Sequence, residues 1–230
     1  MNIRKKILTR CGALLTAVLV LAPTALAAEA EIPYIPQTVP AAQLAPADQR
    51  GQEDWQLLLV NPWHTVPEGY EIKLATLSNG LQVDERIYDD LDDMLSDCRE
   101  AGLNPIVCSA YRTEATQTRL YRNKVARVRA SGVPEDRVEA EAARWVAKPG
   151  TSEHQTGLAL DIVAAGYQIL DEEQEDTAEQ KWLMENSWKY GFILRYPSEK
   201  SDITGIGYEP WHYRYVGKAA AADIYRTGVC

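Results

Sequence analysis

The sequence is poor in basic residues. Its 230 residues include 24 Lys and Arg against 33 Asp and Glu, which gives a formal net charge of -9 and a pI near 4.9. No run of basic residues occurs outside the first ten positions. A surface that follows nucleic-acid phosphates needs clustered Lys and Arg to displace counterions, so nucleic acid is excluded as a partner.

Glycine and proline are also sparse, at 14 and 12 residues. These numbers exclude collagen-like and Gly-rich repeat architectures, and no internal repeat of about 20 to 50 residues is present. The remaining composition, 46% apolar and 25% charged, is that of an ordinary globular chain. Its length allows one sizeable core or at most two small ones.

The amino terminus has the pattern of an export signal. Residues 1–10 carry four basic side chains and no acid, residues 11–22 are almost wholly apolar, and Ala25-Leu26-Ala27 has the small-x-small form of a cleavage site. The apolar run of about a dozen residues is short for a bilayer, which needs roughly 20. We therefore expect a signal peptide at residues 1–27 and an extracytoplasmic, secreted or cell-envelope protein. An uncleaved segment would instead anchor it to the membrane.

Beyond the signal, the composition divides the chain once more. Residues 28–54 are rich in Pro and Ala and predict a semi-extended spacer, which leaves residues 55–230 as the folded domain. We expect this domain to be a monomer. Of four cysteines, Cys98, Cys108 and Cys230 would remain after cleavage, and an odd number cannot all pair within one chain. A Cys98–Cys108 disulfide and two buried thiols are both compatible with the sequence.

Hydrophobic periodicity predicts a mixed order of helices and strands. Asn79-Gly80 between two short apolar runs indicates a tight hairpin, and Asp84 and Gly102 are a plausible cap and stop for the helix between them. Further strands are expected at residues 105–109, 158–163, 192–196 and 211–216, and further helices at 113–130, 134–147, 176–190 and 218–226. Because strands and helices do not alternate regularly, we predict an α+β domain rather than a doubly wound sheet.

Only three histidines occur, and two of them lie in polar segments interrupted by glycine. His154 is followed by Asp161, whose side chain is expected on the polar face of its strand, and His212 follows Glu209 by three residues. Two imidazoles and a carboxylate are a normal ligand set for a catalytic zinc, which leaves a fourth position for water. Glu209 is then the natural general base, brought near by a bend at Pro210. Residue types alone also allow ordinary core or surface histidines at these positions.

Three separated motifs resemble a known family. The chain is similar to the zinc D-alanyl-D-alanine carboxypeptidases of the vancomycin-resistance (VanY-like) type, which are related to D,D-dipeptidases and to the amino-terminal domain of hedgehog proteins. The resemblance covers roughly residues 56–217, with the motifs in the same order. They are Ser109-Ala-Tyr111-Arg112, Ser152-x-His154-x-x-Gly157-x-Ala159-x-Asp161 and Glu209-x-x-His212.

This resemblance implies a fold, a reaction and a set of roles. The fold would be a small antiparallel sheet flanked by helices, and the reaction would be removal of the terminal D-Ala from peptidoglycan stem peptides with one zinc per chain. His154, Asp161 and His212 would bind the zinc, and Glu209 would be the catalytic base. Arg112 would stabilise the oxyanion or bind the substrate's carboxylate. The cleft would also include Ser152, Gln117 and Tyr111 as substrate-binding residues.

The sequence allows other functions as well. An L,D-carboxypeptidase on the same scaffold would trim tetrapeptide stems, and a non-catalytic cell-wall-binding module would need neither Glu209 nor Arg112. A serine-type carboxypeptidase is disfavoured because no Ser-x-x-Lys sequence occurs anywhere in the chain.

Overall fold

The computed structural model describes residues 52–230, which lie within one unit of the chain, Pro46–Cys230. The expected signal peptide at residues 1–27 and the spacer up to residue 51 lie outside the described residues. Among the residues that are described, no helix is both long and apolar enough to cross a membrane.

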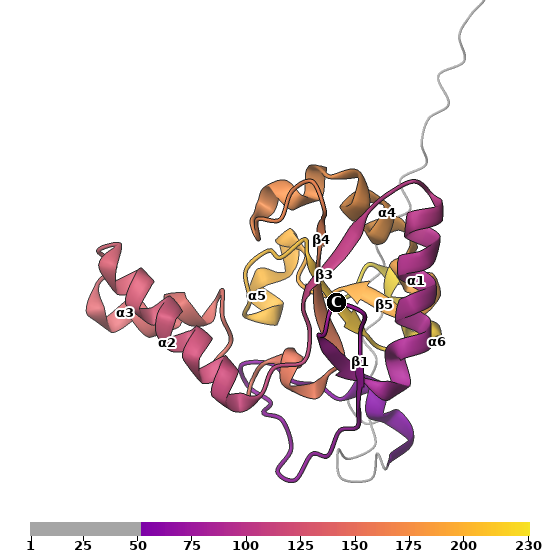
Figure 1. Ribbon diagram of the computed structural model, residues 1–230. Helices are drawn as coiled ribbons and strands as arrows, with labels where there is room; N and C mark the ends of the chain where they lie inside the picture. Colours follow the sequence, from indigo (N-terminus) through magenta and orange to yellow (C-terminus); the bar gives the residue numbers. More distant parts are fainter. Residues whose placement is uncertain (1–51) are drawn as a thin grey trace, which may run out of the picture. The chain divides into compact units, whose positions relative to one another are not determined.

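A four-stranded antiparallel sheet forms the centre of the described unit (Figure 1). Its strands, in spatial order, are β3 (Pro105–Ser109), β4 (Ala159–Ala164), β6 (His212–Tyr215) and β5 (Phe192–Leu194). A separate hairpin pairs β1 (Leu74–Thr76) with β2 (Gln82–Asp84), and Gly80 at its turn has a φ of 84°. The predicted α+β class and the small antiparallel sheet are confirmed.

One face of the sheet is packed against helices. Leu160 and Ile162 of β4 join Leu91 and Leu95 of α1 (Tyr88–Glu100) and Leu183 of α4 (Ala178–Asn186) in the main core. Successive side chains of a strand point to opposite faces, so Asp161 lies on the other face. The sheet thus presents its polar residues on the side that α1 and α4 leave open.

Two helices form a hairpin of their own, α2 (Glu114–Ala130) and α3 (Glu135–Ala143), which lie side by side in Figure 1. A small cluster centred on Val128 and Val138 holds them together. Thr113 caps α2 as predicted, since its side chain accepts a hydrogen bond from Thr116 N at 3.2 Å.

Two predicted helices are shorter than expected. The helix predicted at 134–147 ends at Ala143, because the carbonyl of Arg144 accepts a hydrogen bond from Gly207 N at 2.8 Å instead of continuing the helical ladder. The helix predicted at 176–190 changes after Asn186 to a 3-10 helix, Ser187–Tyr190. That tighter winding lets Leu183 reach the main core while Trp188 packs in a different cluster.

The remaining elements are short. The closing helix α6 (Lys218–Thr227) packs on β5, and α5 spans Ser201–Thr204. The other 3-10 helices are Gln52–Leu57, Glu85–Ile87, Glu153–Thr156, Glu172–Asp176 and Ser198–Lys200. Cys98 is buried, Cys108 is exposed, and both are free thiols in this structure.

Candidate active site

Strand register brings two of the predicted metal ligands together. Asp161 on β4 is the direct cross-strand partner of His212 on β6. Directly opposed residues in an antiparallel pair have neighbouring side chains on the same face. The Nδ1 atom of His212 consequently lies 3.1 Å from Oδ1 of Asp161.

The third predicted ligand comes from a tight turn before β4. His154 lies in the 3-10 helix Glu153–Thr156, which ends at Gly157 with a φ of 71°. A Cβ on Gly157 would stand 2.3 Å from the Ile72 side chain and 2.9 Å from Asp84 N, so glycine is required for space as well as for conformation. The turn directs Nε2 of His154 to within 3.3 Å of Asp161 Oδ1.

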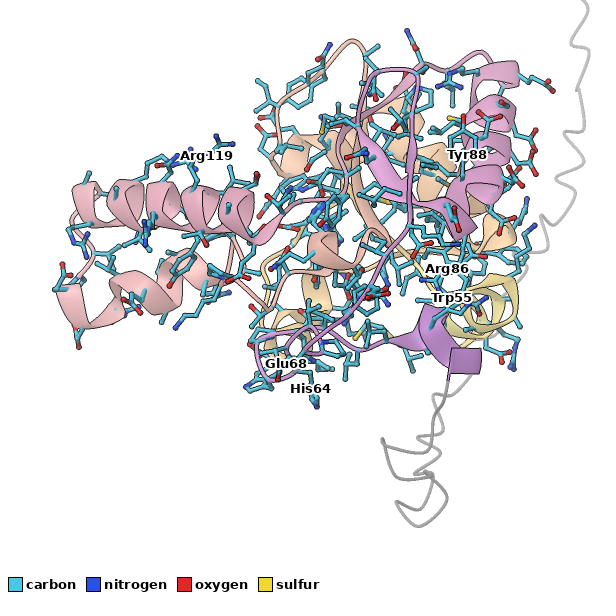
Figure 2. All side chains as sticks on the ribbon, turned by 60° about the horizontal axis from the view of Figure 1, so that its bottom comes forward. Trp55, His64, Glu68, Arg86, Tyr88 and Arg119 are labelled. Carbon is cyan, nitrogen blue, oxygen red and sulfur yellow. The ribbon has the colours of Figure 1, made fainter. Side chains whose placement is uncertain are left out.

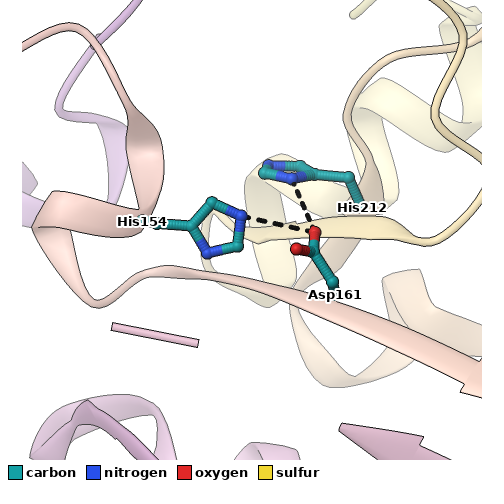
Figure 3. A group of neighbouring side chains, drawn as sticks. All are labelled: His154, Asp161 and His212. Atoms are coloured by element: carbon teal, nitrogen blue, oxygen red, sulfur yellow. Dashed lines mark hydrogen bonds and ion pairs between the residues drawn. The ribbon is translucent and has the colours of Figure 1, made fainter. Parts of the chain in front are cut away.

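The three side chains converge on one point (Figure 3). One nitrogen from each histidine and one Asp161 oxygen lie within 4.8 Å of one another, and all three residues are buried. The opposite nitrogen of His154, Nδ1, lies 2.8 Å from the carbonyl oxygen of Ala110. A proton held at Nδ1 by that carbonyl leaves Nε2 as the free donor for a metal.

His212 is oriented in the same way by a carboxylate that the sequence analysis missed. Its Nε2 lies 3.3 Å from Oε2 of Glu153, a fully enclosed side chain between two arginines. Arg195 Nε donates to Glu153 Oε1 at 2.8 Å, and Arg214 Nη1 donates to the same oxygen at 2.9 Å. We call Glu153, Arg195 and Arg214 the buried ion cluster. Its arginines satisfy one carboxylate oxygen while the other is left for the imidazole of His212.

Arg112 is tied to the ligand set from the opposite side. Its Nη2 donates to Asp161 Oδ2 at 2.7 Å, and both Nε and Nη2 donate to Ser109 Oγ. This contact occupies the Asp161 oxygen that faces away from the histidines. Nη1 of Arg112 makes no hydrogen bond to any residue that the structure describes, so its two N–H groups are available to a ligand.

Glu209 and His212 belong to one turn. His212 N donates to the carbonyl oxygen of Glu209 at 3.1 Å, with Pro210 in the second position, where a β-turn favours proline. The predicted bend at Pro210 is confirmed. It places Oε2 of Glu209 3.7 Å from Nδ1 of His212.

The pKa values of these buried groups are shifted in different directions. Burial raises the pKa of Glu209 to about 8, although His212 opposes the shift. Burial and Arg112 lower the pKa of His154 to about 4, whereas for His212 the hydrogen bonds with Asp161 and Glu153 outweigh burial and raise the pKa to about 9. For Asp161 and Glu153, burial is outweighed by the neighbouring positive groups, which hold both pKa values below their usual range.

A cavity of about 820 Å³ opens onto this cluster. Its lining includes the three clustered residues together with Arg112, Ser152 and Glu209. Its lining also includes residues of α2, Trp145 and the acidic segment at 171–173, which we call the acidic rim.

Two predicted substrate-binding residues, Gln117 and Tyr111, lie outside the lining of this cavity. Gln117 is fully buried, with Nε2 donating to the carbonyl of Ala147 at 2.7 Å and Oε1 without a partner among the described residues. Tyr111 is partly buried, and its backbone N donates to Gln82 O. Neither side chain lines the cavity, and their roles in substrate binding stay predictions.

The family model described as "VanY: D-alanyl-D-alanine carboxypeptidase" matches residues 80–218. The chain belongs to the VanY family. A D-alanyl-D-alanine carboxypeptidase of Enterococcus faecalis is 47% identical over 188 residues, a match covering 81% of this chain and 68% of the relative. Membership in the VanY family makes the chain a peptidase rather than a non-catalytic module.

Solved structures that are similar to this chain agree with this assignment. A mutant of the vancomycin-resistance D,D-pentapeptidase VanY, in complex with Zn(II), is 46% identical, with a TM-score of 0.70 over 76% of this chain and 96% of that one. VanYB in complex with D-alanine-D-alanine is also 46% identical. That match covers 76% of this chain and 94% of VanYB, with a TM-score of 0.71. The LD-carboxypeptidase LdcB is 35% identical, covering 74% of this chain and 81% of its own, with a TM-score of 0.62.

The donor set here fits the zinc seen in VanY. Two imidazole nitrogens and one carboxylate oxygen are typical ligands of a catalytic zinc, and each histidine has its second nitrogen on an oxygen atom, as metal-bound histidines do. We therefore identify His154, Asp161 and His212 as the group that can hold zinc.

Sequence reasoning missed the buried ion cluster. Glu153 lies inside the quoted motif, next to His154, and Arg195 lies in a segment that the resemblance also covers. The available signal for the cluster was the charge of Glu153, directly before His154 in the motif. Burial and pairing of that charge depend on Arg214, 61 positions away, which local pattern does not reveal.

Proposed function

We propose that this protein is an exported D-alanyl-D-alanine carboxypeptidase that removes the terminal D-Ala from peptidoglycan stem peptides. The observation that carries the proposal is the Glu209–His212 turn, which places a carboxylate 3.7 Å from an imidazole of the metal-binding group, inside a cavity large enough for a peptide end. The D-alanine-D-alanine complex of VanYB supports the same substrate end.

Each side chain has a distinct role in the proposed reaction. Zinc held by His154, Asp161 and His212 would polarise the penultimate carbonyl and acidify a water molecule. Glu209 removes a proton from the attacking water as the new C–O bond forms, and it then gives that proton to the departing D-Ala nitrogen as the C–N bond breaks. The free Nη1 of Arg112 donates to the developing oxyanion. Ser152, which lines the cavity, binds the peptide near the scissile residue.

The test of Glu209 is the Glu209→Gln variant. This change keeps the shape of the side chain and removes the proton acceptor, so we expect zinc to remain bound at one per chain and D-Ala release to fall by at least about 100-fold. Zinc content by atomic absorption and released D-Ala by mass spectrometry are the two measurements. His154→Ala is the matched control, which should lose zinc and activity together. Full activity of Glu209→Gln would remove the base assignment.

Trimming of tetrapeptide stems is the second candidate, supported by the similarity to the LD-carboxypeptidase LdcB. Incubation of the zinc-loaded enzyme with defined pentapeptide and tetrapeptide stems separates the two. We expect release of D-Ala from the pentapeptide, in keeping with the higher identity to VanY. Release from the tetrapeptide alone would reverse the assignment.

Export rests on the amino-terminal pattern of residues 1–27. Cleavage after Ala27 would free an enzyme that acts as a monomer on a substrate outside the cytoplasm. Amino-terminal sequencing of the protein recovered from the envelope or medium should begin at Ala28. A chain that retains Met1 in the membrane fraction would indicate an anchor instead.

A further inference from the structure

One wall of the active-site cavity is formed by a helix that the mechanism above does not use. Leu120, Lys124 and Arg127 of α2 all line the cavity. Their spacing of four and three residues places them along one face of the helix. The structure thus directs two positive side chains toward the space that would receive the substrate.

Lys124 has the environment of a binding residue. It is partly buried, and its Nζ lies 5.3 Å from the ring centroid of Trp145, another residue of the cavity lining. No carboxylate among the described residues lies within ion-pairing distance of Nζ. Burial is the main cause that lowers the pKa of Lys124, and Arg127 adds to it, whereas the carboxylates of Glu141 and Glu209 act in the opposite direction without pairing directly with Nζ.

Several of the other charged residues that line the cavity already have partners. Arg112 pairs with Asp161 and also donates to Ser109, which leaves its Nη1 as the donor nitrogen without a partner among the described residues. On the acidic rim, the hydroxyl of Tyr167 donates to Asp171 and lies 3.1 Å from Glu173. Of the three basic residues in the lining, Arg127 is exposed, which leaves Lys124 as the partly enclosed cation without an acidic partner.

We propose that Lys124, supported by the face of Trp145, binds a carboxylate of the substrate and thereby determines which peptides this enzyme accepts. The proposal rests on the function proposed above and names a recognition contact for it. A stem peptide ending in D-Ala-D-Ala offers this chemistry from two sources, the terminal carboxylate and the free carboxylate of the γ-linked glutamate farther up the stem.

The experiment compares three variants on three substrates. Lys124→Met removes the charge but keeps an apolar stem against Trp145, and Lys124→Arg keeps the charge. Arg119→Gln is the matched control, because Arg119 is exposed on the same helix, on the side turned away from α3 (Figure 2), and does not line the cavity. The substrates are a pentapeptide stem with both carboxylates free, the same stem as a terminal amide, and the same stem with the glutamate carboxylate amidated.

On the unmodified stem we expect Lys124→Met to raise KM at least about tenfold with little change in kcat, as loss of one charge-assisted contact predicts. Lys124→Arg should recover most of the loss, and Arg119→Gln should match the unaltered enzyme. The penalty of Lys124→Met should disappear on the one substrate that lacks the bound carboxylate, which identifies its source. An unchanged KM in Lys124→Met, or an equal penalty on all three substrates, would overturn the proposal.

Binding measured without turnover separates this proposal from the proposed function. Calorimetric titration of the unmodified stem into zinc-loaded Glu209→Gln, with and without Lys124→Met, should show the same tenfold difference in Kd. If the unaltered enzyme releases no D-Ala but the difference in Kd is present, the reaction assignment fails and the Lys124 contact stands. If the two Kd values are equal, the Lys124 contact fails whatever the reaction.

Discussion

At the scale of single residues, the site depends on a second layer of polar groups behind the metal-binding atoms. His154 is fixed by the carbonyl of Ala110, Asp161 by Arg112, and His212 by Glu153. Each contact selects the atom that remains for the metal. Three ligands from three different parts of the chain can therefore hold one geometry without the ion having to impose it.

Glu153 gives the sharpest prediction at this scale. In Glu153→Gln the negative charge between Arg195 and Arg214 is lost, which leaves two buried cations uncompensated and the second nitrogen of His212 poorly held. We expect the free energy of unfolding to fall by about 3 kcal/mol and zinc affinity to fall by about 10- to 100-fold. Urea unfolding and competition with a chromophoric chelator measure the two effects.

The exposed pair Arg129–Glu135 supplies the control for that variant. Glu135→Gln removes the same charge from a surface ion pair and should leave both stability and zinc affinity close to their original values. Wild-type zinc affinity in Glu153→Gln would show that His212 needs no such support.

Residue types and spacing were enough to select His154, Asp161, His212 and Glu209 as candidates, and the resemblance of three motifs to a known family gave them their expected roles. Neither signal placed Gln117, which the resemblance put in the cleft but which lies buried, with its Nε2 donating to the carbonyl of Ala147. Whether a polar side chain on a helix faces a cleft or the interior depends on how that helix is set against the rest of the fold. Only Gln117 and Val128 of α2 are buried, so the helix has little apolar pattern from which its orientation could be predicted.

At the scale of elements, the turn that carries His154 is the most constrained segment. In Gly157→Ala the new methyl group would adopt an unfavourable backbone conformation and would also meet Ile72 and the backbone of Asp84. We expect a loss of at least about 2 kcal/mol in the free energy of unfolding, together with weaker zinc binding, as measured by urea unfolding and chelator competition.

Gly150 provides the comparison, because its φ of 82° is similar but nothing lies within 4 Å of the position that a methyl group would take there. Gly150→Ala should show only the conformational cost, about 1 kcal/mol. Equal losses in the two variants would mean that the contact with Asp84 relaxes freely.

Element boundaries were predicted well where a local signal ends the element and poorly where a distant contact does. Thr113 and Gly102 mark the start of α2 and the stop after α1 as expected. The early end of α3 follows from a hydrogen bond between Arg144 and Gly207, which are 63 positions apart. No local pattern in the sequence encodes that contact.

At the scale of the whole described domain, zinc should contribute to stability as well as to chemistry. A ligand that binds only the folded state adds about 4 kcal/mol when its concentration is about a thousand times Kd, and for a domain of this size that corresponds to about 10 °C in Tm. We expect a chelator to lower Tm by this amount in a calorimetric scan. The chelator should have no effect on His212→Ala, whereas equal Tm values for the untreated and chelated enzyme would show that the site does not hold zinc in the folded state.

The strand order has a consequence for biosynthesis. β6 lies between β4 and β5 although it is the last strand of the sheet to be made, and it carries both His212, which can hold the metal, and the partner residues of both neighbours. A nascent chain that stops before His212 lacks an inner strand of the sheet and one of the three residues that can hold zinc. We therefore expect chains truncated before His212 to bind no zinc, so that zinc uptake would mark chains synthesised at least as far as β6.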